Sequence, residues 1–90
     1  MSITVRIPLF LRKFTSGQKI VEVEGKTVGE CIENLEFKFP EIKIFLRDKE
    51  GALYNFWNIY LNSASCYPEG LSKPVKDGDE LNIVALIAGG

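Results

Sequence analysis

The sequence predicts a single α+β domain in which one sheet wraps against one helix. Three observations lead to this prediction. Apolar residues alternate with polar residues near both ends of the chain, as they do in strands. One apolar stripe with helical spacing lies between these segments, and the whole chain has only 90 residues. A chain of this length forms one domain and buries about 60–65% of its unfolded surface, enough for a small core.

The first two elements are predicted to be strands of a hairpin. Apolar residues occupy every second position from residue 3 to residue 9. Pro8 lacks the N–H that a sheet ladder needs, so this strand should end or bulge there. The TSGQ cluster at residues 15–18 predicts a turn. The KIVEVE segment at residues 19–24 alternates again and is expected to be the second strand.

A helix is predicted over residues 26–40. Thr27 is a good N-cap, and Glu30 three residues later completes a capping box. Pro40 ends the helix, and Gly29 inside it costs about 1 kcal/mol relative to Ala. We interpret this glycine as a site of close packing between the helix and the sheet. The apolar stripe consists of Val28, Cys31, Ile32, Leu35 and Phe39.

The next segment is expected to contain a short helical turn, a loop and a strand. Residues 41–54 give the helical turn and a loop around Gly51. The NFWNIYLN segment at residues 55–62 is the clearer strand. Trp57, Ile59 and Leu61 share one face of this strand, while Phe56, Asn58 and Tyr60 share the other.

The chain then returns to a last strand through a loop. Residues 63–70 are predicted to be loop, and Leu71 and Val75 should fill the core from a connecting segment. The sequence Asp77-Gly78-Asp79 is a strong tight-turn signal that should set the register of the strand after it. That strand is ELNIVALIA, with Leu81, Ile83 and Ala85 pointing inward.

The predicted order of elements suits one sheet wrapped on the single helix. Two strands, a crossover helix and two more strands form an α+β roll. The handedness rule for crossovers allows the last strand to lie beside the first, in the middle of the sheet. We therefore expect the chain to leave the sheet from its centre and to project as a free tail.

Composition and charge argue against several classes of function. The formal net charge is −1, so the chain lacks the basic footprint of nucleic-acid-binding proteins. No run of apolar residues approaches the roughly 18 needed to span a membrane. The beginning of the chain alternates and lacks the basic and apolar blocks of a signal peptide. We expect a cytoplasmic protein that binds neither nucleic acid nor membranes.

Residues that carry catalytic chemistry are few. Histidine is absent, which removes the commonest general base and the usual metal ligand. Cys31 and Cys66 belong to no CxxC motif, and two thiols do not complete a zinc site. Cys31 is expected in the core, whereas Cys66 falls in the predicted loop. No pair of acids stands out either, so we expect no metal site and no catalytic residue in this chain.

The remaining feature is a pair of glycines, Gly89 and Gly90, that follows the last strand. Five segments carry a resemblance to a known family, and they occur in this order: VRIPLFLRKFTSGQ, GKTVGECIENL, NIYLN, VKDGDELNI and AGG. In these segments the chain resembles the ubiquitin-like sulfur carriers of the ThiS/MoaD-like family. The combination of RIP, TSGQ, FWNIYLN and LIAGG is most similar to the carriers that supply sulfide for cysteine or homocysteine synthesis.

The resemblance implies a β-grasp (ubiquitin-like) roll, with a mixed sheet of four or five strands packed on one main helix. Residues 1–88 would form the domain, and residues 89–90 a flexible diglycine tail. An E1-like enzyme would use ATP to adenylate the Gly90 carboxylate, which then becomes a thiocarboxylate. The thiocarboxylate would donate sulfide to a synthase that depends on pyridoxal phosphate. The carrier would be a cosubstrate and not an enzyme, with no bound cofactor of its own.

Glycine suits a tail that must enter an active site. Without a Cβ atom, the backbone at Gly89 and Gly90 can approach a partner closely and adopt angles that other residues avoid.

A surface for partner docking is expected on the outward face of the last two strands, unless the loop after the helix covers it. The expected docking residues are Phe56, Tyr60, Val84, Leu86, Ile87 and Arg12. Arg6, Arg12 and Lys13 either steer acidic partner surfaces or form a solvated basic edge.

Four alternatives stay open at the level of the sequence. The chain could supply sulfur for molybdopterin or for the thiazole of thiamine, although Ala85-Leu86 lies where molybdopterin-type carriers often have a proline pair. It could be a protein modifier that forms isopeptide bonds through Gly90. It could be a binding module with an inert tail. A metallopeptidase could also be needed to expose the diglycine before activation.

Overall fold

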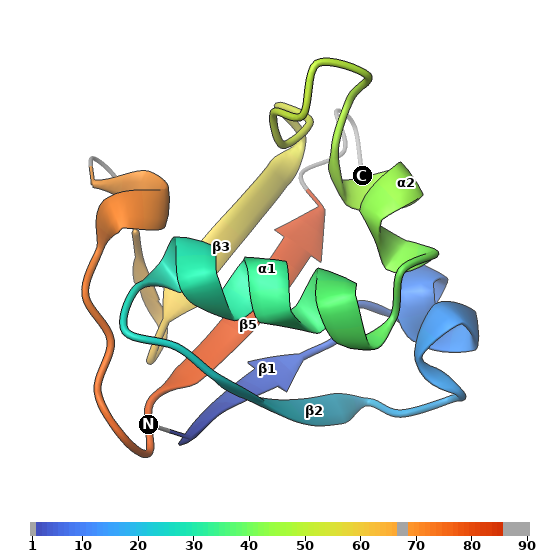
Figure 1. The fold of residues 1–90 in the computed structure, drawn as a ribbon. Helices are drawn as coiled ribbons and strands as arrows, with labels where there is room; N and C mark the ends of the chain where they lie inside the picture. The colour runs from blue at the N-terminus through green and yellow to red at the C-terminus, as the bar shows by residue number, and fades with distance from the viewer. Residues whose placement is uncertain (1, 67–68, 86–90) are drawn as a thin grey trace.

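The computed structural model describes residues 2–66 and 69–85, which form a sheet packed on one main helix (Figure 1). It confirms the α+β class. The elements in chain order are β1 (Ser2–Arg6), η1 (Leu9–Thr15, a 3₁₀ helix), β2 (Ile20–Glu24), α1 (Val28–Lys38), α2 (Ile42–Leu46), β3 (Trp57–Leu61), β4 (Ala64–Ser65), η2 (Gly70–Ser72, a 3₁₀ helix) and β5 (Glu80–Ala85).

The last strand lies in the middle of a mixed five-stranded sheet, as predicted. The strand order is β2-β1-β5-β3-β4. β5 runs parallel to β1 and antiparallel to β3, while the outer pairs β1–β2 and β3–β4 are antiparallel. Figure 1 shows α1 crossing one face of this sheet. The crossover through α1 therefore places β5, the last described strand, at the centre of the sheet.

The core lies between α1 and the inward face of the sheet. Alternate residues of β1 and β5 are buried, and so is the predicted helical stripe from Val28 to Leu35. Each buried Leu, Ile or Val side chain contributes about 1.5–3 kcal/mol. The most completely buried large side chains of the sheet and helix include Ile3, Val5, Ile32, Leu35, Leu81 and Ile83.

The predicted N-terminus of the helix is confirmed in detail. The Glu30 N–H donates to Thr27 Oγ1 at 3.1 Å, which satisfies one of the free amides of the first turn. The Glu30 carboxylate accepts a hydrogen bond from the Lys26 N–H at 2.8 Å, one residue before the position expected for a capping box. The helix ends at Lys38, two residues before Pro40.

The connection between the first two strands contains the predicted turn and, before it, a 3₁₀ helix that was not predicted. At the turn, Ser16 and Gly17 have positive φ angles of 57° and 80°, and the Gln18 N–H donates to the Thr15 carbonyl at 3.0 Å. β1 ends at Arg6, and the chain after Pro8 forms the 3₁₀ helix η1. Two polar side chains stabilise it: Arg12 Nε donates to the Ile7 carbonyl at 3.0 Å, and the buried Thr15 hydroxyl donates to backbone carbonyls. Pro8 removes a ladder hydrogen bond, so the chain leaves the sheet there and residue 9 is not in a strand.

The segment after β3 also differs from the prediction. Residues 64–65 form the short strand β4, although residues 63–70 were expected to be loop. Asn62 and Ser63 both have positive φ angles, 49° and 74°, so they make a tight hairpin turn without a glycine to signal it. Cys66 is buried directly after β4. The sequence pattern could not show this, because left-handed Asn-Ser turns are uncommon.

Two predicted packing roles are corrected. Val75 is buried as expected, but Leu71 is exposed at the surface of η2. Gly29 does mark a close approach, but its neighbour is η2 and not the sheet. A Cβ at Gly29 would lie 3.1 Å from the Leu71 carbonyl oxygen. A side chain at position 29 would therefore press on the 3₁₀ turn before β5, which would have to shift by a few tenths of an ångström.

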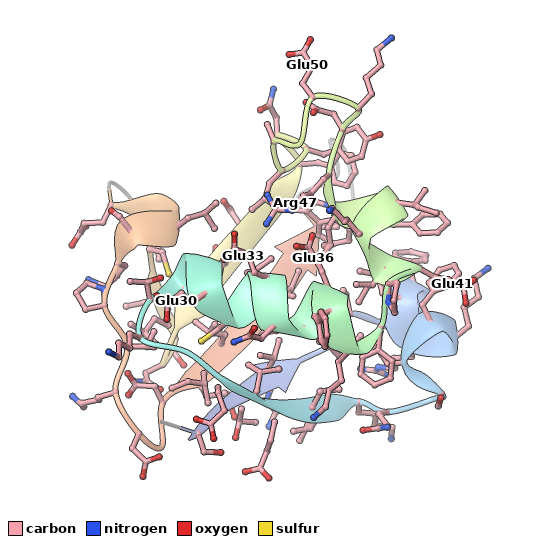
Figure 2. All side chains as sticks on the ribbon, viewed as in Figure 1. Glu30, Glu33, Glu36, Glu41, Arg47 and Glu50 are labelled. Carbon is pink, nitrogen blue, oxygen red and sulfur yellow. The ribbon has the colours of Figure 1, made fainter. Side chains whose placement is uncertain are left out.

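A buried ion pair joins α1 to the segment after α2 (Figure 2). Arg47 Nε lies 2.6 Å from Glu36 Oε2, and both side chains are largely buried. Arg47 Nη1 also donates to the Gly51 carbonyl at 2.8 Å. The predicted helical turn and loop around Gly51 are confirmed, and this pair fixes both against the main helix.

Candidate functional site

The candidate site begins where β5 ends, because the predicted reactive residue lies only a few positions farther along the chain. Ala85 is the last described residue, and it pairs with Trp57 at the start of β3. Gly90 is five residues beyond Ala85. Leu86, Ile87, Gly89 and Gly90 lie outside the described residues, so the site is built here from the surface around the end of β5.

A set of hydrogen bonds holds β5 in register at its other end. The Asp77-Gly78 turn is confirmed: the Asp79 N–H donates to the Lys76 carbonyl at 3.0 Å, and Gly78 has a φ of 88°. The turn also contacts β1, since the Ser2 N–H donates to Asp77 Oδ1 at 2.8 Å. The predicted role of this turn in setting the register is consistent with these bonds.

Asp79 connects the start of β5 to the turn after β3. Its buried carboxylate accepts from Asn62 Nδ2 and from the Lys76 N–H, both at 2.9 Å. These hydrogen bonds, the one from Asn62 foremost, lower the pKa of Asp79 below its ordinary value, because they stabilise the charged form. The side-chain oxygen of Asn62, Oδ1, in turn accepts a hydrogen bond from the Glu80 N–H at 2.9 Å. The start of β5 is thus bound to both neighbouring strands: to β1 through the bond between Asp77 and Ser2, and to the turn after β3 through Asn62.

Aromatic side chains connect the end of β5 to the helices beside it. Trp57, the partner of Ala85, donates from Nε1 to the Phe45 carbonyl in α2 at 2.9 Å. The Phe45 ring stacks on Phe14 of η1, with 4.5 Å between ring centroids. Figure 1 shows the arrowhead of β5 pointing to the end of the molecule that carries α2. η1, α2 and the start of β3 therefore surround the end of β5.

Large apolar side chains are exposed around this point. The described residues expose nine such side chains, and six belong to η1, α2 or the loop before β3. η1 follows β1, which is parallel to β5, and β3 is antiparallel to β5, so all three segments lie at the same end of the sheet. These six form what we call the apolar rim: Leu9 (72% exposed), Phe10 (68%), Ile44 (69%), Phe45 (43%), Tyr54 (38%) and Phe56 (42%).

The described residues among those predicted for docking do not form the single apolar strand face that was expected. Tyr60 and Val84 lie at outward positions of β3 and β5 and are half-buried. Their cross-strand partners are Asn82 and Asn58, so this face is mostly polar. Phe56 precedes β3, and its ring stacks on Tyr54 at 5.3 Å between centroids. Phe56 therefore joins the apolar rim.

The predicted basic residues also have defined places. Arg12 is half-buried in η1 and donates to the Ile7 carbonyl. Lys13 is exposed, with Nζ 5.3 Å from the centroid of the Phe14 ring. Arg6 lies on the outward face of β1, 3.2 Å from the Glu80 carboxylate. Arg12 and Lys13 therefore lie beside the apolar rim, whereas Arg6 pairs within the sheet.

Sequence reasoning missed five members of the rim: Leu9, Phe10, Ile44, Phe45 and Tyr54. A signal was present for the first pair. The LFL run after Pro8 breaks the alternation of β1, so it fits poorly to a half-buried strand. No comparable signal marks Ile44 and Phe45, since a five-residue helix is too short to show which face is buried.

The described residues offer no alternative site based on metal or thiol chemistry. They contain no group of three or more His, Cys, Asp or Glu side chains that could hold a metal ion. Burial raises the pKa of the Cys31 thiol to about 11 and also raises that of Cys66, so both thiols stay protonated and unreactive. No helix among these residues has the length and apolar character needed to cross a membrane.

Comparison of the sequence with known proteins identifies the family of this chain. The profile of the ThiS family matches residues 5–90, nearly the whole chain. The chain belongs to the ThiS family. It is 40% identical to the sulfur carrier protein CysO of Mycobacterium tuberculosis over an alignment of 93 residues that covers all of both chains. It is 33% identical to a putative sulfur carrier protein of Archaeoglobus fulgidus, again over the full length of both.

Solved structures of ThiS-like proteins share the fold. A chain of the BexX/CysO complex from Amycolatopsis orientalis matches with a TM-score of 0.86 and 43% identity, over 98% of this chain and 99% of that one. CysO of M. tuberculosis matches with a TM-score of 0.85 and 38% identity, over 94% and 99%. The modifier SAMP1 of Haloferax volcanii has a TM-score of 0.86 at 24% identity, which shows the β-grasp fold alone.

Proposed function

We propose that this protein is a sulfur carrier whose working atom is the carboxyl carbon of Gly90. The observation that carries the proposal is the 40% identity to CysO over the full length of both chains. The structure supports it, since β5, the last described strand before Gly90, is held at the centre of the sheet and ends beside exposed apolar side chains. The protein acts as a cosubstrate for partner enzymes and performs no catalysis itself.

The chemistry proceeds in two steps at one carbon. The Gly90 carboxylate attacks the α-phosphate of ATP in an E1-like enzyme, forming an acyl adenylate and releasing pyrophosphate. Sulfide then attacks the carbonyl carbon, the C–O bond to AMP breaks, and AMP leaves with the electron pair. The product is a thiocarboxylate, whose sulfur is nucleophilic and remains attached to the protein. Because the activation consumes ATP, we place the protein in the cytoplasm.

The acceptor that we propose is a pyridoxal-phosphate-dependent synthase of cysteine or homocysteine. The similarity to CysO supports this choice over molybdopterin or thiamine synthesis. Such a synthase holds an electrophilic carbon in a closed site, and a sulfur on the end of a narrow peptide can enter where a folded domain cannot. Glycines at positions 89 and 90 keep the peptide narrow, because they carry no Cβ atom.

The test is the intact mass of the protein after incubation with an E1-like enzyme of the same organism, Mg-ATP and sulfide. The wild-type chain should exchange one C-terminal oxygen for sulfur. The matched control carries one extra alanine after Gly90 and should stay unmodified when no peptidase is present. If the wild-type chain never gains sulfur with any such enzyme, the proposal is wrong. Sulfur gain followed by stable conjugates to lysines, without transfer to a synthase, would show a modifier instead.

A further inference from the structure

The apolar rim is too exposed to serve only the stability of this chain. Leu9, Phe10 and Ile44 keep more than two-thirds of their surface in contact with solvent. Apolar side chains scattered singly over a surface need no explanation, whereas grouped ones mark places where another molecule binds. The other three exposed large apolar residues are dispersed over β2, α1 and η2.

The rim is held rigid by contacts beneath it. The Phe14–Phe45 stack joins η1 to α2, and the hydrogen bond from Trp57 to the Phe45 carbonyl joins α2 to β3. The Tyr54 N–H donates to the Leu46 carbonyl at 3.0 Å, which fixes the loop before β3 on α2. A preorganised apolar surface loses little conformational entropy when a partner covers it.

The short distance from Ala85 to Gly90 restricts which surface a partner can use. Five residues span at most about 18 Å when fully extended. The described fold measures 31 × 29 × 25 Å, so the reach of the tail is shorter than the molecule is wide. An enzyme that holds Gly90 in its active site must therefore cover the surface around Ala85. That surface is the apolar rim.

The charges beside the rim indicate the character of the partner surface. The charged residues within η1 and α2 are all basic: Arg12, Lys13 and Lys43. Acidic residues also lie close by: Glu41 is the N-cap of α2, and Glu50 lines one hollow with Ile44 and Tyr54 (Figure 2). Only η1 is uniformly basic, so a complementary partner surface is apolar at its centre and acidic opposite η1.

We propose that the apolar rim is the docking surface for the adenylating enzyme that takes Gly90 into its active site. This inference rests on the proposed function and identifies the residues through which the first partner is recognised. We choose the adenylating enzyme as the occupant because, in the proposed function, activation precedes every later use of Gly90, whether transfer of sulfur or conjugation. Phe10 and Ile44 are its principal contacts, since they are large, apolar and highly exposed.

The experiment measures ATP–pyrophosphate exchange by the E1-like enzyme of the same organism as a function of carrier concentration. The variants are Phe10→Asp and Ile44→Asp, with Phe37→Asp as the matched control. Phe37 is 87% exposed on α1 and lines a groove with the edge strand β2, two strands away from β5. The rim variants should raise KM for the carrier about tenfold or more, as hot-spot residues do, while Phe37→Asp leaves it unchanged.

Two further measurements make the outcome decisive. Circular dichroism confirms that each variant is folded, and Lys13→Glu should raise KM at low salt more than at high salt, as an acidic partner edge requires. Equal KM values for the rim variants and Phe37→Asp would overturn the proposal. So would a wild-type dimer that Phe10→Asp converts to monomer without a change in KM, since the rim would then bind a second copy.

The result also separates this inference from the function on which it rests. If the wild-type chain supports exchange but the rim variants are equally good substrates, the docking surface is wrong and the carrier function stands. If the wild-type chain supports no exchange with any adenylating enzyme of the organism, the function itself fails.

Discussion

Asp79 shows how one side chain controls the direction of a strand. Its two oxygens bind different segments: Oδ1 accepts from Asn62 after β3, and Oδ2 accepts from the Lys76 N–H before β5. The Thr4 N–H also donates to the Asp79 carbonyl at 3.0 Å, so the residue contacts β1 as well. Three neighbours of β5 therefore meet at one buried residue, two of them at its carboxylate and one at its backbone carbonyl.

We expect the stability of the fold to depend on the ionisation of Asp79. Its pKa is lower in the folded chain than in the unfolded one, so its contribution is complete above the unfolded pKa and is lost as the pH falls through the folded pKa. The free energy of unfolding in urea should therefore decrease below about pH 4. Asp79→Asn should reduce that decrease.

The control for this measurement is Asp77→Asn in the same turn. Asp77 is exposed and accepts a single hydrogen bond from the Ser2 N–H. Its substitution should leave the pH dependence of the unfolding free energy close to that of the wild-type chain. If Asp77→Asn and Asp79→Asn flatten the curve equally, the role assigned to Asp79 is wrong.

At the scale of elements, α1 and α2 are joined by the ion pair of Glu36 and Arg47. The Glu36 side chain is only 6% exposed and the Arg47 side chain 14%. A buried ion pair adds little to stability compared with apolar residues of similar size, but removing one partner leaves a charge without compensation. The pair therefore acts mainly as a geometric link that holds α2, and with it part of the apolar rim, in place.

Arg47→Leu should lower the free energy of unfolding by about 3–5 kcal/mol, because it leaves Glu36 buried without its cation. Adding Glu36→Leu should recover most of that loss, and a double-mutant cycle from urea unfolding gives the coupling energy. The exposed pair of Glu69 and Lys73, 3.3 Å apart, is the comparison. Lys73→Leu should have no measurable effect, and an effect as large as that of Arg47→Leu would contradict this account.

The elements that the sequence predicted well are those whose pattern repeats over several turns or strand positions. The capped helix from Val28, the central place of β5 and the Asp-Gly turn before it are all confirmed. η1 and β4 were missed, because each depends on a local event: the exit of the chain at Pro8 and a left-handed turn at Asn62 and Ser63. Such events are decided by single residues and carry no periodicity.

The candidate site was predictable in part. The role assigned to the diglycine stays a prediction, because Gly89 and Gly90 lie outside the described residues, whereas Phe56 was correctly selected as exposed and apolar. The expected strand face around Tyr60 and Val84 was wrong as an apolar surface, because its cross-strand neighbours are asparagines. The rim brings together η1, α2 and the start of β3, and only the tertiary fold places these segments at one end.

At the scale of the whole molecule, the proposed function predicts that the carrier binds one partner at a time. Two enzymes that each require Gly90 must cover the same surface around Ala85, because about 18 Å of chain cannot reach past either of them. A carrier that has gained sulfur must therefore dissociate from the adenylating enzyme before it meets the acceptor.

This restriction predicts competition between the two partners. An inactive acceptor synthase, added to the pyrophosphate-exchange assay, should raise KM for the carrier without changing kcat. An equal concentration of an unrelated protein is the control. Should the synthase leave KM unchanged at concentrations that bind the carrier, the two partners occupy separate surfaces and the restriction does not hold.

The position of β5 between two neighbours has a mechanical consequence. An enzyme that grips the tail pulls along the axis of this strand, and such a load acts on the ladders with β1 and β3 together. Hydrogen bonds loaded along the strand axis share the force in shear, and β5 has two such ladders where an edge strand has one. A partner that pulls on the end of β5 would therefore have to shear both ladders before the domain opened.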